Sequence, residues 1–572
     1  MKYENFIKTI LSATVLFTAA IAVGQEATES EESTKSKLWD KVKKETGVSG
    51  GIGYTSTFYD IKGASSQRPP HFWQISANLN IKAGPINMPF SARFSPTGND
   101  GTYPTVPTQI GMSPKYKAWT AHIGWRSVTF SDFSLGGNQF VGGGVEYQPE
   151  GGIIHVKALA GRFVKSNIEY DPNLIIVGTP AYERWGGGAQ VIVGKADKNI
   201  GFHVFKAKDD PSSLEGSDSL LITPSDNLVY GFTGKYPVSK SISLFGEYTI
   251  SALTQDTRIE QGIQSGYSYL NNIGNAFYSN PTTIQKKAMN FGANFKIKEA
   301  NLKLGYRRVD PGYRSLGAVF LNNDLEDVTA NLGFGVLDKK LNFSITGGFQ
   351  RNNLDADKLT RTLRLIGSVS ATYAPNEKWN FGANYANFTT STNQTLVQEG
   401  FDTLRFAQVT TSAGANATRM FKGETFDQSV MVIGNYQEAV SNGDRNSQTY
   451  LAMTNYNITY KPIKLTGTLG LSYNKSIAPA AETDLVGPTV GASKPLLKNK
   501  LNVGAAASYL VTTINTVNAG VITTARLFAN YKVGKNHTFN ASYSTVNRNL
   551  ASAAPPVNAT ENIGIIGYQF AF

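Results

Sequence analysis

The chain ends in Asn562-Ile563-Gly564-Ile565-Ile566-Gly567-Tyr568-Gln569-Phe570-Ala571-Phe572. Successive side chains of a β-strand point to opposite faces, so this stretch divides into two sets. One face carries Gly564, Ile566, Tyr568, Phe570 and Phe572. The other face carries Ile563, Ile565, Gly567, Gln569 and Ala571. The stretch therefore predicts a strand with an apolar stripe that ends in an aromatic residue.

This stripe resembles the β-signal that closes bacterial outer-membrane barrels and is read by their assembly machinery. The resemblance implies that Ile566, Tyr568, Phe570 and Phe572 act as an assembly signal and that the machinery is a partner. An ordinary soluble strand can alternate in the same way. The other end of the chain therefore bears on the interpretation.

The first residues are typical of a secretory signal peptide. Lys2 and Lys8 give a basic start, 10–23 is an uncharged apolar run, and 22–24 supplies small residues. We expect cleavage after Gly24. A membrane anchor is less favoured, because a spanning helix needs roughly 20 apolar residues, and the absence of Cys excludes a lipid anchor. Together the two ends predict a Gram-negative outer-membrane location, with lipid as a partner.

The alternation of the last strand recurs along the chain. Apolar and polar residues alternate in the stretches 119–126, 341–350, 379–386 and 501–509. A soluble sandwich also alternates, but with the residues that flank these stretches the runs extend over about 10 to 14 residues, the length a tilted strand needs to cross a bilayer. Strands of soluble proteins are usually about 5 or 6 residues long. The pattern favours a transmembrane barrel.

The connections fall into two classes. Short turns are expected at 83–87, 148–151, 196–199, 375–377 and 533–536. Longer polar segments are expected at 96–107, 165–183, 209–226, 253–286, 310–323, 389–405, 475–483 and 547–560. Short periplasmic turns alternating with long extracellular loops are typical of outer-membrane barrels. Counting hairpins predicts 13 outer loops and an antiparallel all-β barrel of about 26 strands; if the pair 88–95 with 109–113 is wrong, the count is 24.

Composition agrees with a barrel. Charged residues are 17% of the 572, with 56 Gly, 27 Tyr and 31 Phe, and the mean hydropathy is −0.23. Only every second strand residue meets lipid, so a barrel does not need a hydrophobic average. Cys is absent, which excludes disulfides and thiolate sites. The net charge of +12 lacks the clustered patch that nucleic-acid binding needs, so no nucleic-acid partner is expected.

Residues 25–47 differ from the predicted barrel at 48–572. An acidic lead with Glu26, Glu29, Glu31 and Glu32 precedes a basic stretch, 36–44, that contains Trp39. We interpret this region as a disordered lead and a short periplasmic helix. The helix is either a solvated tail or a plug or docking element.

Two stretches, 306–318 and 322–327, resemble a segment of large uncharacterised outer-membrane barrels of the Bacteroidetes. The stretches 353–358 and 113–116 are similar to other parts of that group. The resemblance implies a location and a fold and carries no functional residues. A TonB-dependent transporter fits poorly, because it has a large plug domain before its barrel.

No catalytic pattern is present. His71, His122, His155, His203 and His537 lack metal-ligand spacing, and nothing places a nucleophilic Ser beside a His and a carboxylate. We expect no enzyme activity, cofactor or metal site. The Gly runs at 142–144 and 186–188 lack the Lys-Ser/Thr of a phosphate loop.

Two loops carry distinctive residues. Asp310, Asp324, Glu326 and Asp327 either bind a divalent cation or, as we favour, pair with Arg307, Arg308 and Arg314 in a loop that folds into the lumen. The segment 253–286 contains Tyr267, Tyr269, Phe277 and Tyr278. Because it is so aromatic, we expect it to fold into the mouth or to contact a partner.

Two functions remain open. The first is a pore for passive transport of small hydrophilic or anionic solutes, since 16 to 18 strands already leave an aqueous channel. The predicted lumen-lining bases are His122, Arg126, Lys157, Lys303, Arg307, Arg364 and Arg526. The alternative is a non-porin barrel in an assembly, secretion or surface-binding complex, with a periplasmic or surface protein partner. An outer-membrane hydrolase ranks far below both.

Overall fold

The computed structural model describes residues 46–66, 68–95, 108–166, 180–214, 222–260, 277, 279–358, 360–394, 406–441, 446–551 and 557–572. The predicted signal peptide at 1–24 lies outside these residues. So does the predicted lead and helix at 25–47, except for Thr46 and Gly47, which already belong to the first strand. The barrel thus begins two residues before the predicted boundary.

The described residues form strands joined by turns and two short 3-10 helices, η1 (Pro211–Ser213) and η4 (Lys461–Ile463). No helix among them is long and apolar enough to cross a membrane. The first strands are β1 (Thr46–Lys62), β2 (His71–Ala83), β3 (Ile86–Phe94), β4 (Gln109–Met112), β5 (Lys115–Tyr116), β6 (Trp119–Ser127), β7 (Gln139–Tyr147), β8 (Ile154–Val164), β9 (Arg184–Gly194), β10 (Asn199–Asp209), β11 (Asp226–Pro237), β12 (Ile242–Thr254), β13 (Thr283–Ile297) and β14 (Ala300–Val309).

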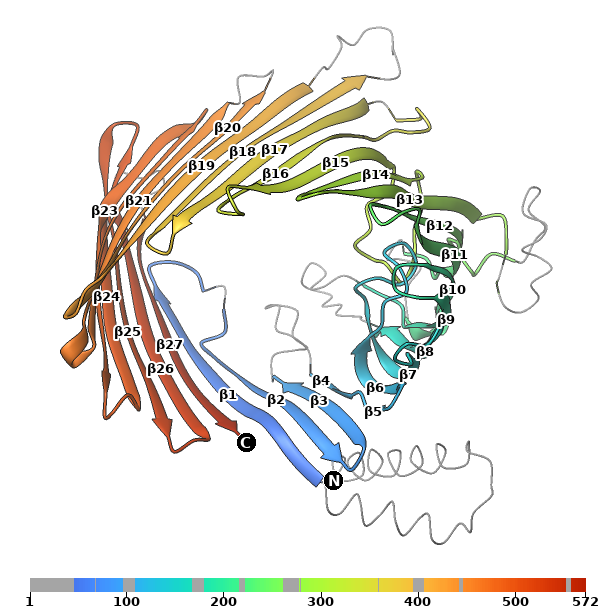
Figure 1. Cartoon of the computed structure of the whole chain (residues 1–572), viewed down its shortest axis with the longest axis horizontal. Coiled ribbons are helices and arrows are strands. Elements are labelled where there is room, and N and C mark those ends of the chain that lie inside the picture. The colour runs from blue at the N-terminus through green and yellow to red at the C-terminus, as the bar shows by residue number, and fades with distance from the viewer. Residues whose placement is uncertain are drawn as a thin grey trace.

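The remaining strands are longer on average. They are β15 (Leu325–Val336), β16 (Leu341–Arg351), β17 (Thr360–Asn376), β18 (Trp379–Gln394), β19 (Phe406–Lys422), β20 (Phe426–Ser441), β21 (Ser447–Tyr460), β22 (Leu465–Ala478), β23 (Ala481–Leu496), β24 (Leu501–Ile514), β25 (Val517–Val533), β26 (His537–Leu550) and β27 (Val557–Ala571). Each pairs antiparallel with its chain neighbours, and β27 pairs with β1 from Gly51↔Ala571 to Lys62↔Thr560. The sheet is therefore a closed barrel (Figure 1).

The barrel has 26 strands. The pieces β4 and β5 both pair with β3 on one side and β6 on the other, in one continuous register. Proline lacks the N–H that a ladder needs, so Pro89 and Pro114 interrupt the strand between the two pieces. Counting β4 and β5 as one strand, 27 becomes 26. The predicted count is confirmed, including the uncertain pair, and the count of 24 is wrong.

The two ends of the barrel differ, as predicted. Connections at one end, which we call the short-turn end, contain two to six residues, for example 84–85 and 497–500. At the opposite, long-loop end they reach 28 residues in 255–282. Two predicted long loops are wrong, however. Residues 475–483 and 547–560 belong largely to strands, because β22 pairs with β23 and β26 pairs with β27 across these segments. Cross-strand ion pairs, Lys475 with Glu482 and Arg548 with Glu561, join the strand ends.

Neighbouring residues of the strands face different surroundings. On β10, Phe202 is 42% exposed on the outer face, whereas the next residue, His203, is fully buried. Large apolar side chains are exposed on outer faces around the ring, including Phe232, Phe291, Leu304, Phe349, Leu365, Val490 and Leu527. Such an extended exposed apolar surface is typical of a wall that meets an apolar medium.

Aromatic residues gather on the outer face near the short-turn end. Ring pairs on adjacent strands lie 4.6 to 6.1 Å apart and comprise Trp119 with Tyr147, Phe334 with Phe343, Tyr373 with Phe381, Phe426 with Tyr460 and Phe539 with Tyr568. We call this set the aromatic belt. Aromatic girdles of this kind mark the interface of a membrane barrel with water.

Candidate functional site in the barrel interior

Two connections at the long-loop end fold into the barrel beside β6–β15 (Figure 1). They are 128–138 and 310–324, and we call them the lumenal cover. They meet in a parallel bridge between Leu135 and Gly317, and the Tyr313 hydroxyl donates to the Phe133 carbonyl at 2.7 Å. The cover is thus one unit built from two loops that lie far apart in the chain.

Short-range chemistry shapes each loop. The Ser131 hydroxyl accepts hydrogen bonds from the backbone N–H groups of Phe133 and Ser134, both at 3.1 Å, and so forms a tight turn. Position 317 requires a glycine, because neighbouring groups approach its backbone closely. A Cβ there would lie 2.6 Å from both a Phe205 ring carbon and the Ser134 carbonyl oxygen.

The cover packs on the inner wall through a hydrophobic cluster. Leu135 and Leu316 of the cover contact Phe140, Phe205 and Val229 of the strands, and all five are 0 or 1% exposed. Each fully buried side chain of this size contributes about 1.5–3 kcal/mol. The predicted inward folding of the 310–323 loop is confirmed.

Polar contacts fix the position of the cover. Asn227 of β11 accepts a bond from the Leu316 backbone N–H at 3.0 Å, and Ser251 of β12 donates to the Arg314 carbonyl at 2.6 Å. Burial lowers the pKa of the Arg314 guanidinium; nearby Arg184 lowers it further, and Asp209 opposes the change. The Arg314 side chain is nevertheless exposed, so the cover carries an accessible cation.

The rest of the inner wall is different. Between Leu325 and Ala519, no hydrophobic side chain of the described residues is buried. The inner face of β16–β23 is instead rich in neutral polar residues, among them Asn342, Ser344, Thr346, Ser368, Ser370, Asn384, Ser412, Asn416, Asn435, Gln437, Asn455, Asn457, Thr468, Ser472 and Asn474. We call this face the polar wall. The barrel interior therefore has one side that is packed against the cover and one side that is lined by polar side chains.

Three of the predicted lumen bases lie on the covered side, where each has a partner. His122 Nε2 is 3.3 Å from Glu146 Oε1. Arg126 donates to the Ser91 hydroxyl at 2.8 Å. Lys157 donates to the carbonyl of Thr129, a residue of the cover, at 3.0 Å. Of the three, His122 faces a carboxylate, whereas the contacts given for Arg126 and Lys157 are with neutral acceptors, so these two side chains keep their positive charge.

The other four predicted bases lie on the inner faces of β14, β17 and β25. Arg307 bonds Asp327 at 2.8 Å, and the Lys303 ammonium lies 5.1 Å from the centre of the Phe245 ring. Arg364 and Arg526 are exposed, on β17 and β25. The predicted bases are therefore spread around the ring, and their effect on solutes stays a prediction.

A recess of about 1070 Å³ lies below the cover on the inner wall. Its polar lining includes His155, Lys157, Gln190, Lys235, Glu247 and Asn290. Gln190 donates to the Phe130 carbonyl at 2.8 Å, which connects the floor of the cover to β9.

The acidic residues at 310–327 form ion pairs, but only some of these pairs use the predicted partners Arg307 and Arg308, and no ion pair of Arg314 is found among the described residues. Asp310 bonds Arg308 at 3.1 Å, Asp327 bonds Arg307, and Glu326 bonds Arg351. Asp324 pairs with Lys358. No group of three or more His, Cys, Asp or Glu side chains suited to a metal occurs in the described part of the chain.

The aromatic loop is only partly described. Tyr267, Tyr269 and Tyr278 lie outside the described residues. Phe277 is 2% exposed and packs on Leu228 and Ala252, whose side chains point away from the cover. At this residue the expectation of folding into the mouth is wrong, because the outer face of β10–β12 offers an apolar surface near the rim.

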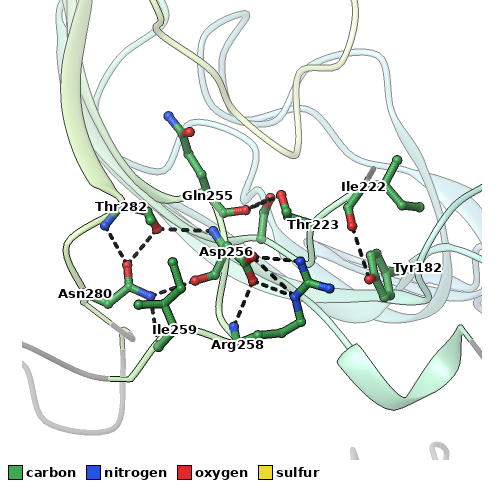
Figure 2. A network of polar contacts seen from close by, with 10 residues as sticks. Tyr182, Ile222, Thr223, Gln255, Asp256, Arg258, Ile259, Asn280 and Thr282 are labelled. Carbon is green, nitrogen blue, oxygen red and sulfur yellow. Dashed lines mark hydrogen bonds and ion pairs between the residues drawn. The ribbon is translucent and has the colours of Figure 1, made fainter. Parts of the chain in front are cut away.

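A polar network joins three connections at the long-loop end (Figure 2). Asp256 forms an ion pair with Arg258 at 2.8 Å, and Asn280 donates to the Asp256 carbonyl at 2.7 Å. The Thr223 hydroxyl donates to the Gln255 carbonyl at 2.7 Å. Hydrogen bonds from Arg258 lower the pKa of the Asp256 carboxyl against a smaller effect of burial. The network holds the rim above β10–β13.

Ser113, which follows β4, was not predicted from the sequence to have a functional role. Its hydroxyl lies 3.0 Å from His122 Nδ1, and the opposite ring nitrogen faces Glu146. The three residues lie on adjacent strands and point to the same inner face. No sequence motif joins them, since cross-strand register brings them together.

Comparisons with known proteins give a fold-level result. No family model and no curated protein matches this chain. The P pilus usher (PapC) translocation pore is similar with a TM-score of 0.38 and 10% identity, over 92% of this chain and 99% of that chain.

OccAB4 of Acinetobacter baumannii has a TM-score of 0.29 and 11% identity, over 68% of this chain and 99% of its own. The FrpB iron transporter of Neisseria meningitidis has a TM-score of 0.33 and 13% identity, over 93% of this chain and 83% of its own. We draw no functional conclusion from similarity at this level. The resemblance to Bacteroidetes barrels stays a prediction.

Proposed function

We propose that this chain is an outer-membrane barrel that forms a pore for passive transport of small hydrophilic or anionic solutes. The observation that carries the proposal is the exposed polar wall on the inside of a closed 26-strand ring. Strands about 4.8 Å apart give roughly 125 Å of wall measured across the strands, more than the 16–18 strands of known aqueous channels provide.

The outer surface supports the membrane location. Apolar side chains exposed around the ring suit lipid tails, and the aromatic belt suits the boundary between lipid and water. The lumenal cover narrows one side of the interior, so the pathway runs along the polar wall. Exposed Arg364 and Arg526 give that pathway a positive potential that attracts anions.

The test is single-channel conductance of the purified barrel in a planar bilayer under a salt gradient. We expect steady steps with a weak preference for anions. A correctly folded barrel that stays silent would contradict the pore and favour the non-porin alternative, and crosslinking in mild detergent would then be used to look for a partner.

A further inference from the structure

Ser113, His122 and Glu146 form a shielded chain of polar contacts. Ser113 Oγ is 3.0 Å from His122 Nδ1, and His122 Nε2 is 3.3 Å from Glu146 Oε1. The second Glu146 oxygen accepts a bond from Gln148 at 3.0 Å. The His122 and Glu146 side chains are only 11% and 19% exposed. This series of contacts leads from a hydroxyl to a fixed carboxylate, and water has little access to compete for its polar groups.

We propose that these three residues form a hydrolase site for small carboxylic esters, with Ser113 as the nucleophile. The Glu146 carboxylate lies 3.3 Å from His122 Nε2 without hydrogen-bond geometry, and its negative charge favours the proton on that nitrogen. Nδ1 is then the nitrogen that accepts the Ser113 hydroxyl proton. A base held by a carboxylate and bonded to a hydroxyl is the arrangement that activates a serine. Either nitrogen of a neutral imidazole can be the acceptor.

A recess lies beside the nucleophile. Its volume is about 470 Å³, and Ser113, Arg126, Asn80 and Ser91 are among the residues that line it. A guanidinium has five N–H donors, and contacts with Ser91, Trp125 and Pro89 use three of those of Arg126. A cationic donor in the same recess can stabilise an oxyanion. The polar lining and Arg126 favour a short hydrophilic ester, in particular one that carries a negative charge.

The reaction balances with water as the only co-reactant. Ser113 Oγ attacks the ester carbonyl carbon while its proton moves to His122 Nδ1, and the carbonyl oxygen becomes an anion near Arg126. The anion collapses, the alcohol leaves with the proton from His122, and an acyl-Ser113 ester remains. His122 then takes a proton from water, the hydroxide attacks the acyl carbon, and the carboxylic acid departs as Ser113 regains its proton.

This inference departs from the sequence-based expectation that the chain is not an enzyme. Strand register brings the three residues together, because Ser113 and His122 are cross-strand neighbours and Glu146 lies on the next strand. The site is on the covered side of the barrel and does not depend on whether the polar wall conducts. It can therefore fail or succeed independently of the pore.

The test is labelling of the folded full-length barrel with a water-soluble fluorophosphonate, followed by mass spectrometry of its peptides. We expect covalent modification at Ser113 and hydrolysis of 4-nitrophenyl acetate. Ser113→Ala should abolish both, and His122→Gln should slow labelling by about 100-fold, the loss expected for a general base. Glu146→Gln should slow it by a smaller factor.

Ser56→Ala is the matched control. Ser56 Oγ lies 2.8 Å from His71 Nε2, but no ion-paired carboxylate is found at His71 in the described part of the chain. The control variant should label like the native barrel. Absence of labelling in the native folded protein, or labelling at a residue other than Ser113, would overturn the proposal without the need for any variant.

Discussion

Leu316 is the residue on which the docking of the lumenal cover depends most directly. It is 1% exposed inside the hydrophobic cluster. Leu316→Ala should cost about 2–5 kcal/mol of packing, loosen the cover and give larger, noisier conductance steps. Phe320→Ala is the control, because Phe320 lies on the same loop but is 87% exposed. Equal conductance in the two variants would contradict a constriction by the cover.

Asp324 gives the cover a pH dependence. Burial by itself raises the pKa of this carboxyl, but hydrogen bonds from Lys358 and from the backbone N–H groups of Leu354 and Asn353 outweigh burial and lower the pKa. The stability that the ionised Asp324 contributes to the fold is therefore fully present at pH values above its unfolded-state pKa of about 3.9. It is lost as the pH falls from that value through the lower folded pKa.

We expect hydrogen-exchange protection of 352–358 to be constant from pH 8 to 5 and to fall below about pH 4. The Leu354 N–H donates to Asp324 at 2.9 Å and reports this loss directly. Asp324→Asn should lower the protection already at pH 7. An Asn variant with the same acid transition as the native protein would assign the transition to another group.

At the scale of elements, closure depends on β27. The Phe572 N–H donates to the Gly50 carbonyl at 3.0 Å, Gly50 returns a bond at 2.8 Å, and Phe570 lies 4.8 Å from the His537 ring. These contacts join the last strand to both of its neighbours. The sequence predicted the stripe but not its partners, since pairing in a sheet depends on strands that are distant in the chain.

Removing Phe572 together with Phe570→Ala should lower the fraction of folded barrel, measured by heat-modifiable mobility on a gel. Each lost aromatic removes up to about 1.5–3 kcal/mol of apolar contact, and the predicted assembly signal is lost as well. Phe426→Ala is the control, because Phe426 belongs to the aromatic belt but lies far from the C-terminus. Equal losses in both would mean that the belt, and not a signal, determines assembly.

At the scale of the molecule, charge on the exposed inner face of the strands, on the polar wall and on the nearby β25, should set the ion preference. Arg364→Glu with Arg526→Glu reverses two exposed bases on β17 and β25, and the preference should move towards cations. Arg307 is less informative, because its partner Asp327 would face a new carboxylate. The effect should shrink at 1 M salt, where the screening length is about 3 Å.

Lys498→Glu with Lys535→Glu makes the same charge change in exposed short turns, away from the polar wall. This control should keep the native reversal potential. An equal shift in both double variants would assign selectivity to the entrance of the pore instead of its wall.

The sequence by itself determined the closed barrel, its strand number and the difference between its two ends. Alternation and turn chemistry are local, so the stretches 341–350 and 379–386 can be interpreted without knowing their neighbours. The loops 475–483 and 547–560 were predicted too long, because their polar residues continue the strands through cross-strand pairs such as Lys475 with Glu482.

Only the tertiary structure decided what fills the barrel. The bridge between Leu135 and Gly317 joins residues that are 182 positions apart, and the contact between Ser113 and Glu146 through His122 spans three strands. No local pattern encodes either arrangement. Long-range contacts follow from strand register and from loops packing on the inner wall, and these are fixed only when the whole ring closes.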